Sequence, residues 1–274
     1  LLNTALVRYL EFNDVYIGEA AGGLPSDQIP ALMAVAESVD ASGAELVEAV
    51  VVAYELLCRG VDTGLMWPNG FDYVAWFAYS TTAAVGKLMD LSEDDLVNAI
   101  GIAGTSNNPL LISRLGEVSM WKGVASAYAV HNSVQACQMA RAGMTGPSGV
   151  VEGDGGVLDT VADGTDLDFG ELDPRVTDEF KILQTGYKFF PSAYFTQSPV
   201  TAVLDVLAES NLDHRSVESV DVRTFDMAVD ATAGEEKWAS DITREQANFS
   251  IPYCVAAALV DGELTRDQFA PERL

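Results

Sequence analysis

Two neighbouring stretches near the start of the chain hold an unusual mixture of residues: Leu10-Glu11-Phe12-Asn13-Asp14 and Gly23-Leu24-Pro25-Ser26-Asp27-Gln28-Ile29-Pro30-Ala31. Apolar residues with helical spacing flank them on both sides. A surface linker would not normally carry so many large apolar residues, and a buried helix would not carry so many glycines and prolines. A loop held in a cleft between helices accommodates both, and such loops commonly carry functional residues. We therefore predict a functional site in this segment, with helices around it.

The chain is strongly acidic. Its 274 residues include 41 Asp and Glu against 15 Lys and Arg, which gives a net charge of −26. The acids recur along the chain, as in Ser92-Glu93-Asp94-Asp95, and lysine is scarce. A dispersed negative surface suits a cytoplasm of high salt, because the screening length falls to about 3 Å at 1 M. We expect a halophilic source; the alternative is an acidic protein from an ordinary source.

The same composition excludes several classes of protein. Hydrophobic residues make up 49% of the chain, which is enough for a sizeable core and argues against disorder. The negative field makes nucleic acid and anionic membranes poor partners. Cys58, Cys137 and Cys254 are far apart and odd in number, so no disulfide framework or metal spacing is indicated. No apolar run reaches the ~18 residues of a spanning helix, and we expect a soluble, cytoplasmic protein.

The first part of the chain, residues 1–186, has the pattern of an all-helical domain. Gly43 to Cys58 is rich in Ala and Val, and Ser92 with Asp95 predicts the start of a helix that continues to Ile102. Trp121 to Ala142 predicts another helix, which Gly143 closes. Small residues in these segments allow close helix packing. Gly and acidic residues dominate 149–173, which we interpret as an exposed connection.

The remainder, residues 187–274, has the pattern of a smaller α+β domain. A short amphipathic helix is predicted over Val200 to Leu207, and a strand over Val217 to Phe225, where Val220 and Val222 alternate. Thr243 with Gln246 predicts the start of a helix that runs to Val260. Because the chain begins in the middle of a helical pattern and stops where another element should follow, we expect it to be part of a longer protein.

Cations at the start of a helix are the first candidates for chemistry. Arg114 precedes the helix expected from Trp121, and Lys122 lies just inside it. Free N–H groups and the helix dipole favour a carboxylate at a helix N-terminus, and the two cations would strengthen such a site. The alternative is that both side chains are solvated surface cations.

Lys188, Tyr253 and Asp14 are further candidates, each with an ordinary alternative. Three aromatic residues surround Lys188 in the sequence, so its side chain either snorkels to water or is partly desolvated and suited to proton transfer. Tyr253 stands in an apolar helix pattern and is either a core residue or a proton donor. Asp14 is either a cap, a surface acid or a proton acceptor. His131 and His214, the two histidines, have no pattern of catalytic partners and are interpreted as structural.

Short blocks spread over nearly the whole chain carry a family resemblance. They are Phe12-Asn13-Asp14 with Pro25-Ser26-Asp27, Ala53-Tyr54-Glu55, Gly70-Phe71-Asp72, Asn98-Ala99-Ile100, Trp121-Lys122-Gly123, Gly143-Met144-Thr145-Gly146-Pro147, Lys188-Phe189-Phe190-Pro191, Thr243-Arg244-Glu245 with Ser250-Ile251-Pro252-Tyr253, and Asp261-Gly262. Together, and in this order, they resemble the MmgE/PrpD family. The resemblance implies a large helical domain and a smaller α+β domain with the site between them, and it implies a homodimer.

The resemblance also implies the chemistry: a lyase that needs no metal or other cofactor and acts on a small di- or tricarboxylate such as 2-methylcitrate. A proton is removed beside a carboxylate, and water or CO₂ is lost, which requires cations, a base and an acid. By residue match the catalytic positions are Asp14, Lys122, Lys188 and Tyr253. The expected substrate-binding positions are Ser26, Asp27 and Tyr73, which lie in or beside matched blocks. Arg114 is added to them because it precedes the helix expected from Trp121.

Two positions depart from the family pattern. Leu24 stands where the family commonly has His before Pro-Ser-Asp, and Tyr73 stands where it commonly has His after Gly-Phe-Asp. Imidazole is the side chain best suited to proton transfer near neutral pH, whereas tyrosine ordinarily titrates near 10. A decarboxylase or epimerase of the same family is therefore one alternative. A relative that binds carboxylates without catalysis is another, and an unrelated helical protein is a third.

Overall fold

The computed structural model describes residues 1–18, 22–162, 179–210, 212–238 and 241–274. The chain forms two compact units, each assembled from separate stretches of sequence. The first unit comprises Leu1–Arg8, Asn13–Ile112 and Gly123–Tyr187; the second comprises Tyr9–Phe12, Ser113–Lys122 and Lys188–Leu274. Both are mainly helical, so the predicted mainly α fold class is confirmed.

The first unit is built around long helices that follow the predicted segments. Its helices are α1 (Leu2–Tyr9), α2 (Ile29–Ser38), α3 (Gly43–Asp62), α4 (Phe77–Leu88), α5 (Glu93–Ser106), α6 (Lys122–Arg141) and α7 (Val157–Val161). Ser92 accepts a hydrogen bond from the Asp95 N–H at the start of α5, as the sequence predicts. After α6, Gly143 adopts φ +92°, a conformation that glycine reaches without steric cost.

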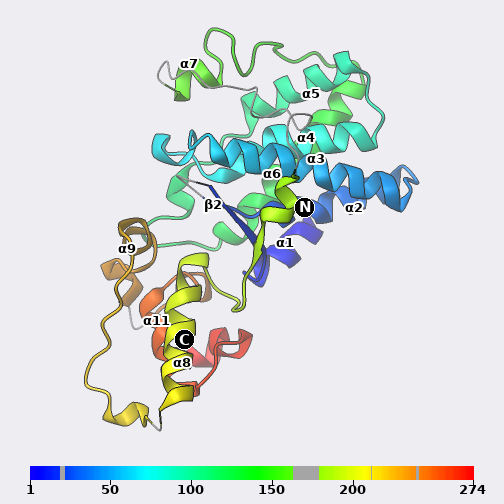
Figure 1. Cartoon of the computed structure of the whole chain (residues 1–274). Helices are drawn as coiled ribbons and strands as arrows, with labels where there is room; N and C mark the ends of the chain where they lie inside the picture. Colours follow the sequence, from blue (N-terminus) through cyan, green and yellow to red (C-terminus); the bar gives the residue numbers. More distant parts are fainter. Residues whose placement is uncertain (19–21, 163–178, 211, 239–240) are drawn as a thin grey trace. The chain divides into compact units, whose positions relative to one another are not determined.

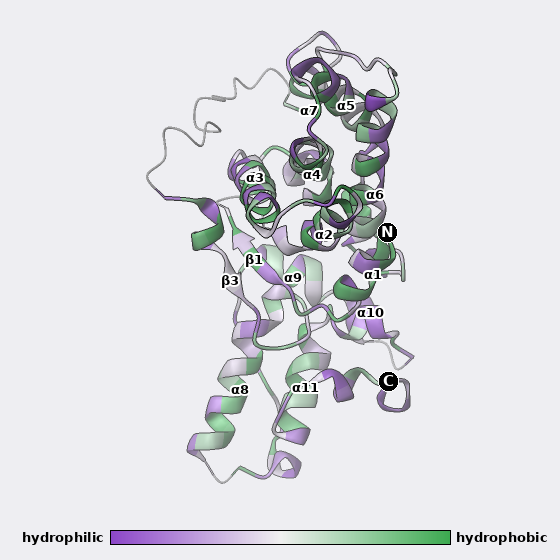
Figure 2. Cartoon of the chain, turned by 90° about the vertical axis from the view of Figure 1, so that its right-hand side faces the viewer, coloured by the Kyte–Doolittle hydropathy of each residue, from purple (hydrophilic) through white to green (hydrophobic). Residues whose placement is uncertain are grey.

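Small side chains hold the helices of the first unit together. The helices α2, α3 and α4 lie side by side, and α5 packs on α4 (Figure 1, Figure 2). Between them, Leu32, Ala53 and Val85 are completely buried. A second cluster joins Leu57 of α3 to Val130 of α6. Close approach of these helices therefore follows from the Ala-rich composition noted in the sequence.

A small sheet also belongs to the first unit, where an all-helical domain was predicted. Its strands are β1 (Asp14–Ile17), β2 (Gly22–Gly23) and β3 (Gly186–Tyr187), in the order β2-β1-β3. Both neighbours are antiparallel to β1, with Tyr16 opposite Gly23 and Asp14 opposite Tyr187. The pairing joins segments far apart in sequence through strands of only two residues, which are too short to leave a periodic pattern.

The predicted exposed connection is only partly an open loop. Its described part, residues 149–162, contains α7, and Val157, Leu158 and Val161 pack against the hydrophobic core of the first unit. Ala162 is buried there. The interpretation of 149–162 as an exposed connection is therefore only partly correct, because apolar residues among the glycines find a core to pack on. Residues 163–173 lie outside the described residues.

The second unit contains α8 (Gln197–Glu209), α9 (Asp226–Thr232), α10 (Arg244–Ala247) and α11 (Ile251–Asp261). Thr243 and Gln246 form the predicted capping box at α10. The single helix predicted from Thr243 to Val260 is nevertheless wrong, because the chain breaks between α10 and α11. Ser250 accepts a hydrogen bond from the Tyr253 N–H and starts a new helix, in whose first turn Pro252 is tolerated.

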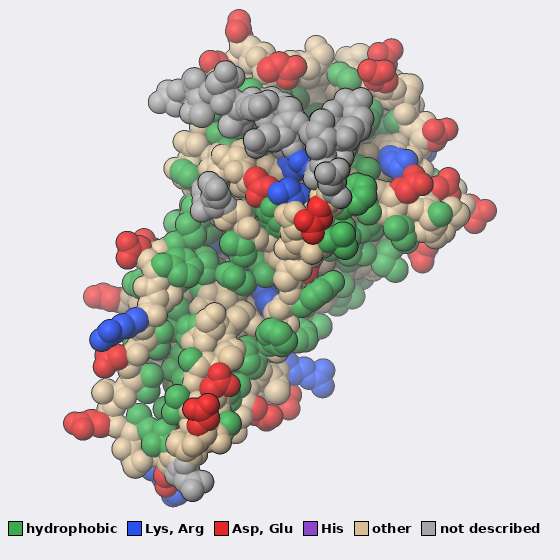
Figure 3. All heavy atoms as spheres, viewed as in Figure 1, with side chains coloured by type: hydrophobic (Ala, Val, Ile, Leu, Met, Phe, Trp, Pro, Cys, Tyr) green, Lys and Arg blue, Asp and Glu red, His purple; other side chains and the backbone are tan. Residues whose placement is uncertain are grey.

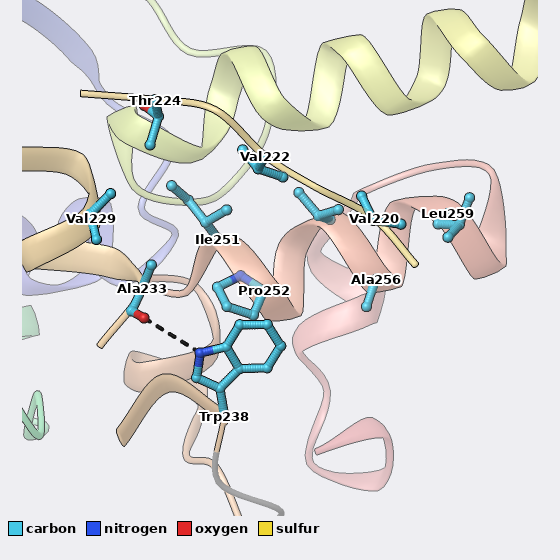
Figure 4. Close-up of a pocket in the computed structure, with 11 residues that line it drawn as sticks. Val220, Val222, Thr224, Val229, Ala233, Trp238, Ile251, Pro252, Ala256 and Leu259 are labelled. Atoms are coloured by element: carbon cyan, nitrogen blue, oxygen red, sulfur yellow. Dashed lines mark hydrogen bonds between the residues drawn. The ribbon is translucent and has the colours of Figure 1, made fainter. Parts of the chain in front are cut away.

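The strand predicted over Val217 to Phe225 is also not formed. These residues make no strand ladder within the described part of the chain, and Val220 and Phe225 are about half exposed. Figure 4 shows Val220, Val222 and Thr224 on a segment that borders an apolar hollow against α11, with Trp238 at its edge. The β-branched residues give this segment its strand propensity, but a strand requires a hydrogen-bonded neighbour.

Candidate active site

Lysine side chains gather in the second unit. Three of the five lysines of the chain, Lys122, Lys188 and Lys237, are at least 94% buried. By contrast, Asp and Glu side chains project at many separate points of the face drawn in Figure 3. Lysine is almost never fully buried unless a partner compensates the lost hydration. The three buried ammonium groups therefore mark a built polar centre.

Glu11 provides the carboxylate that joins two of these lysines. One carboxylate oxygen lies 3.0 Å from Lys122 Nζ, and the other lies 3.1 Å from Lys188 Nζ. Lys188 Nζ also donates to the backbone oxygen of Glu11 at 3.0 Å. The Glu11 side chain is 5% exposed and both lysine side chains are 1% exposed, so these ion pairs are shielded from water.

The turn between α10 and α11 completes the surroundings of Lys122. Its Nζ donates to Asn248 Oδ1 at 2.9 Å and lies 4.4 Å from the centre of the Phe249 ring. Asn248 is held in place because its backbone oxygen accepts from the Ala193 N–H at 2.7 Å. Charge, amide and aromatic face together hold the Lys122 ammonium in one position.

Lys237 lies against the same aromatic ring. Its Nζ is 5.7 Å from the centre of Phe249 and donates to the backbone oxygen of Gly116 at 2.7 Å. Glu236 is 3.9 Å away, yet burial lowers the pKa of Lys237. This lysine was not a predicted site residue. The Glu-Glu-Lys-Trp sequence around it is typical of an exposed turn and offers no signal of burial.

Two other predicted residues of the second unit lie in different surroundings. Arg114 is 3% exposed, so the alternative that it is a solvated surface cation is wrong. The Tyr253 hydroxyl donates to the backbone oxygen of Gln268, and its ring packs on Phe269. Burial raises the pKa of Tyr253, which keeps this hydroxyl protonated. These contacts are those of a core tyrosine rather than those of the lysine centre.

A second polar centre, in the first unit, is formed around Asp14 at the start of β1. One oxygen of its carboxylate accepts from the Ser26 N–H at 3.0 Å, and the other accepts from the Tyr54 hydroxyl at 2.8 Å. Burial, followed by the charge of Asp14, raises the pKa of Tyr54 far above its usual range. Tyr54 therefore stays a hydrogen-bond donor, and Asp14 is held as an oriented carboxylate.

Asp27 is the next member of this centre and is completely buried. It accepts hydrogen bonds from Asn13 Nδ2 at 2.7 Å and from the Tyr73 hydroxyl at 3.1 Å, while Arg8 Nε lies 3.4 Å away. The predicted residues thus form two neighbouring hydrogen-bonded sets, Asp14 with the Ser26 backbone and Asp27 with Tyr73. Leu24, which replaces a common family histidine, is 8% exposed and packs in the apolar core beside them.

Sequence reasoning assigned no role to several members of these centres. Glu11 was part of the opening stretch, and its only sequence signal is an acid between the apolar Leu10 and Phe12. Asn13 and Tyr54 stand in matched family blocks, but Asn248 does not. These residues join the centres through contacts between distant parts of the sequence. One example is the hydrogen bond from Lys122 to Asn248, which are 126 positions apart.

The arrangement suits anionic ligands. Buried ammonium groups in fixed positions bind carboxylates and stabilise charge that develops on them. Within the described part of the chain, no three His, Cys, Asp or Glu side chains are grouped as metal ligands would be. In the same residues, no helix combines the length and apolar character needed to cross a bilayer.

The structure defines a class of protein: it is mainly helical and has two units, one with buried lysines and the other with buried carboxylates. The chain belongs to the MmgE/PrpD family. The MmgE/PrpD N-terminal domain matches residues 1–170, and the MmgE/PrpD C-terminal domain matches residues 190–274.

Individual relatives are distant in sequence. The chain is 24% identical to the 2-methylcitrate dehydratase of Salmonella typhi, over 98% of this chain and 57% of the relative. It is 28% identical to an alkylcitrate dehydratase of a fungal species, over 80% of this chain and 46% of the relative. It is 25% identical to a cis-aconitate decarboxylase-like protein of Aspergillus oryzae, over 100% of this chain and 60% of the relative. The chain thus spans about half the length of the curated relatives it matches.

Proposed function

We propose that this protein is a lyase, and more narrowly a hydro-lyase, that acts on a small di- or tricarboxylate by proton abstraction beside a carboxylate. The observation that carries the proposal is the burial of Lys122 and Lys188 on one shared carboxylate. In a chain of net charge −26, binding of an anionic substrate requires a local cluster of positive groups that opposes the overall charge. The names of the relatives, which act as dehydratases or resemble a decarboxylase, agree with this chemistry.

Lys122 and Lys188 are proposed to bind substrate carboxylates. When a proton leaves the carbon beside a carboxylate, negative charge moves onto the carboxylate oxygens. Fixed ammonium groups stabilise this charge more strongly in the transition state than in the ground state. The electron pair then forms a carbon–carbon double bond, and the neighbouring hydroxyl leaves as water after it gains a proton. Arg114 is proposed to assist in binding the anion.

Asp14 is proposed as a proton acceptor. The hydrogen bonds from Tyr54 and the Ser26 N–H orient its carboxylate, which supports a role that needs a defined geometry. Asp27 and Tyr73 are proposed to contribute to substrate binding. Tyr253 is proposed, on the strength of the family resemblance, to donate to the developing charge; in the structure its hydroxyl donates to the backbone oxygen of Gln268.

Proton NMR of the protein in D₂O and concentrated KCl tests this proposal. The protein is incubated in turn with 2-methylcitrate, citrate and cis-aconitate. We expect an unsaturated acid, or deuterium exchange beside a carboxylate. Lys122→Ala and Lys188→Ala should abolish the signal, whereas Lys87→Ala, whose side chain is 44% exposed, is the matched control. No turnover or exchange with any of the three acids would contradict the proposal.

A decarboxylase or epimerase of the same family would also begin by forming a carbanion beside a carboxylate. The NMR products separate these from dehydration, because loss of CO₂ shortens the acid and epimerisation leaves its formula unchanged. A non-catalytic carboxylate-binding relative is a second candidate. The observation in its favour is that Leu24 is buried in the core and Tyr73 donates to Asp27, so neither offers an imidazole.

Restoring the two histidines distinguishes catalysis from binding alone. If the protein has lost an ancestral activity, Leu24→His with Tyr73→His should raise the rate of turnover. If the site uses other proton carriers, the same double substitution should lower the rate, because Tyr73→His also removes a buried hydrogen bond to Asp27. We further propose a cytoplasmic homodimer from a halophilic source, on the strength of the family resemblance and the acidic composition.

A further inference from the structure

We propose that Glu11 is the positioning residue that holds Lys122 and Lys188 as a pair for a substrate carboxylate. This inference rests on the proposed function, in which the two lysines bind the substrate. It adds a residue to which no role was given by sequence. Glu11, Lys122 and Lys188 all belong to the second unit.

The Glu11 carboxylate is shared between the two lysines. Each Glu11 oxygen contacts a different lysine, at 3.0 Å and 3.1 Å, so rotation of the Glu11 side chain would break both contacts together. Lys188 is held twice, since it also donates to the Glu11 backbone oxygen. One residue therefore sets the positions of two ammonium groups that come from distant parts of the chain.

The backbone of Glu11 adopts an uncommon conformation. Its φ is +53°, in the left-handed region that residues with a Cβ rarely adopt. Glycine, asparagine or aspartate would occupy this position at lower steric cost. Glutamate in such a conformation is consistent with a functional demand on its longer acidic side chain, because the strain is offset by the contacts that the carboxylate makes.

Glu11 also supplies charge to the pair. Lys122 also faces Asn248 and the Phe249 ring, and neither of these groups supplies a negative charge. Across the same ring lies Lys237, whose own acidic neighbour is Glu236. A buried lysine without a nearby carboxylate loses its proton more easily. The Glu11 carboxylate lies at ion-pair distance from both ammonium groups and supplies a negative charge to each of them.

The test compares Glu11→Asp with Glu11→Asn. Both side chains have the same size and both tolerate a positive φ, so the two variants differ mainly in charge. Isothermal calorimetry with citrate as the probe measures binding to the protein. We expect both shorter side chains to weaken citrate binding, and Glu11→Asn, which also lacks the charge, to bind citrate roughly tenfold more weakly than Glu11→Asp or worse. Glu218→Gln, which alters an exposed acid of the same unit, is the control.

Equal citrate affinity of the Asp and Asn variants would overturn the inference. If Glu11→Asn does not fold, Glu11→Gln takes its place, because it keeps the length of the side chain. A merely structural role would lower the stability of both variants without separating their citrate affinities.

A second readout does not depend on a ligand. The five lysines give few ¹⁵N signals, which Lys→Arg variants assign, and the Nζ signals of Lys122 and Lys188 are followed against pH. We expect both to lose their protons at lower pH in Glu11→Asn than in Glu11→Asp. If the unmodified protein binds no citrate, the proposed function fails, and this titration alone decides the role of Glu11. Identical titration of the two lysines in Glu11→Asn and Glu11→Asp would overturn the inference.

Discussion

Gly60, near the end of α3, is a position where a single methyl group should destabilise the protein. A Cβ atom added there would lie 2.5 Å from Trp76 Cδ2 and 2.8 Å from Cε2 and Cε3 of the same ring. Carbon atoms in contact are normally about 3.5–4.0 Å apart. Because the indole is rigid and 8% exposed, either it or α3 must shift.

The expected cost follows from two opposed effects. Overpacking of a core typically costs about 1–3 kcal/mol, and overlap with three atoms of one ring places Gly60→Ala at the upper end. Alanine regains up to about 1 kcal/mol through its helix propensity. We therefore expect Gly60→Ala to lower the free energy of unfolding by about 2 kcal/mol, and Tm by roughly 4–8 °C.

Urea unfolding followed by tryptophan fluorescence measures this change, with Gly43→Ala as the matched control. Gly43 begins the same helix, and a Cβ there would meet nothing within 4 Å. Its replacement should leave stability unchanged or raise it by up to about 1 kcal/mol. If Gly60→Ala unfolds at the same urea concentration as Gly43→Ala, the packing of Trp76 on α3 is not as described.

Four further predictions concern stability. Tyr79→Phe should leave the free energy of unfolding unchanged or raise it by about 1 kcal/mol in urea titrations, because the buried Tyr79 hydroxyl has no partner among the described residues; a clear loss would contradict this. Ser250→Ala should cost about 1 kcal/mol or more, since Ser250 caps α11 and also donates to the Lys237 backbone oxygen, and thermal unfolding measures the loss. Burial raises the pKa of Tyr16 to about 12, so the folded state keeps a proton that the unfolded state loses near 10; stability should be intact below about pH 10 and fall towards pH 12, less steeply in Tyr16→Phe. The net charge of −26 predicts that the midpoint of unfolding increases when the KCl concentration is raised from about 0.1 to 3 M, because salt screens the repulsion between acidic side chains. A midpoint that does not change with KCl would contradict this prediction.

Local signals in the sequence were sufficient for most helices. Ser92 and Thr243 each bond the backbone three residues further on, so the start of a helix is encoded within one turn. Ser250 and Pro252 are equally local signals, and they mark the break before α11. The prediction missed this break because the apolar pattern on either side of it indicated one continuous helix. The helical fold class needed no knowledge of tertiary contacts.

The site was only partly predictable. Asp14, Ser26, Asp27 and Tyr73 were selected from family blocks or beside them, and the structure places them in two neighbouring hydrogen-bonded sets. Lys122 and Lys188 were also selected, but Glu11, which connects them, was not. Their catalytic and binding roles stay predictions, as does the role of Tyr253.

Composition and short-range pattern thus determined the helices, their caps and the acidic character of the chain, because each depends on residues within a few positions of one another. Tertiary structure alone decided that Val217 to Phe225 forms no strand, since a strand depends on a neighbour that propensity cannot supply. It also decided that Lys188 meets Glu11, 177 residues earlier in the chain. Burial of a charge is stable only beside its partner, and a linear sequence does not show which partner the fold will bring.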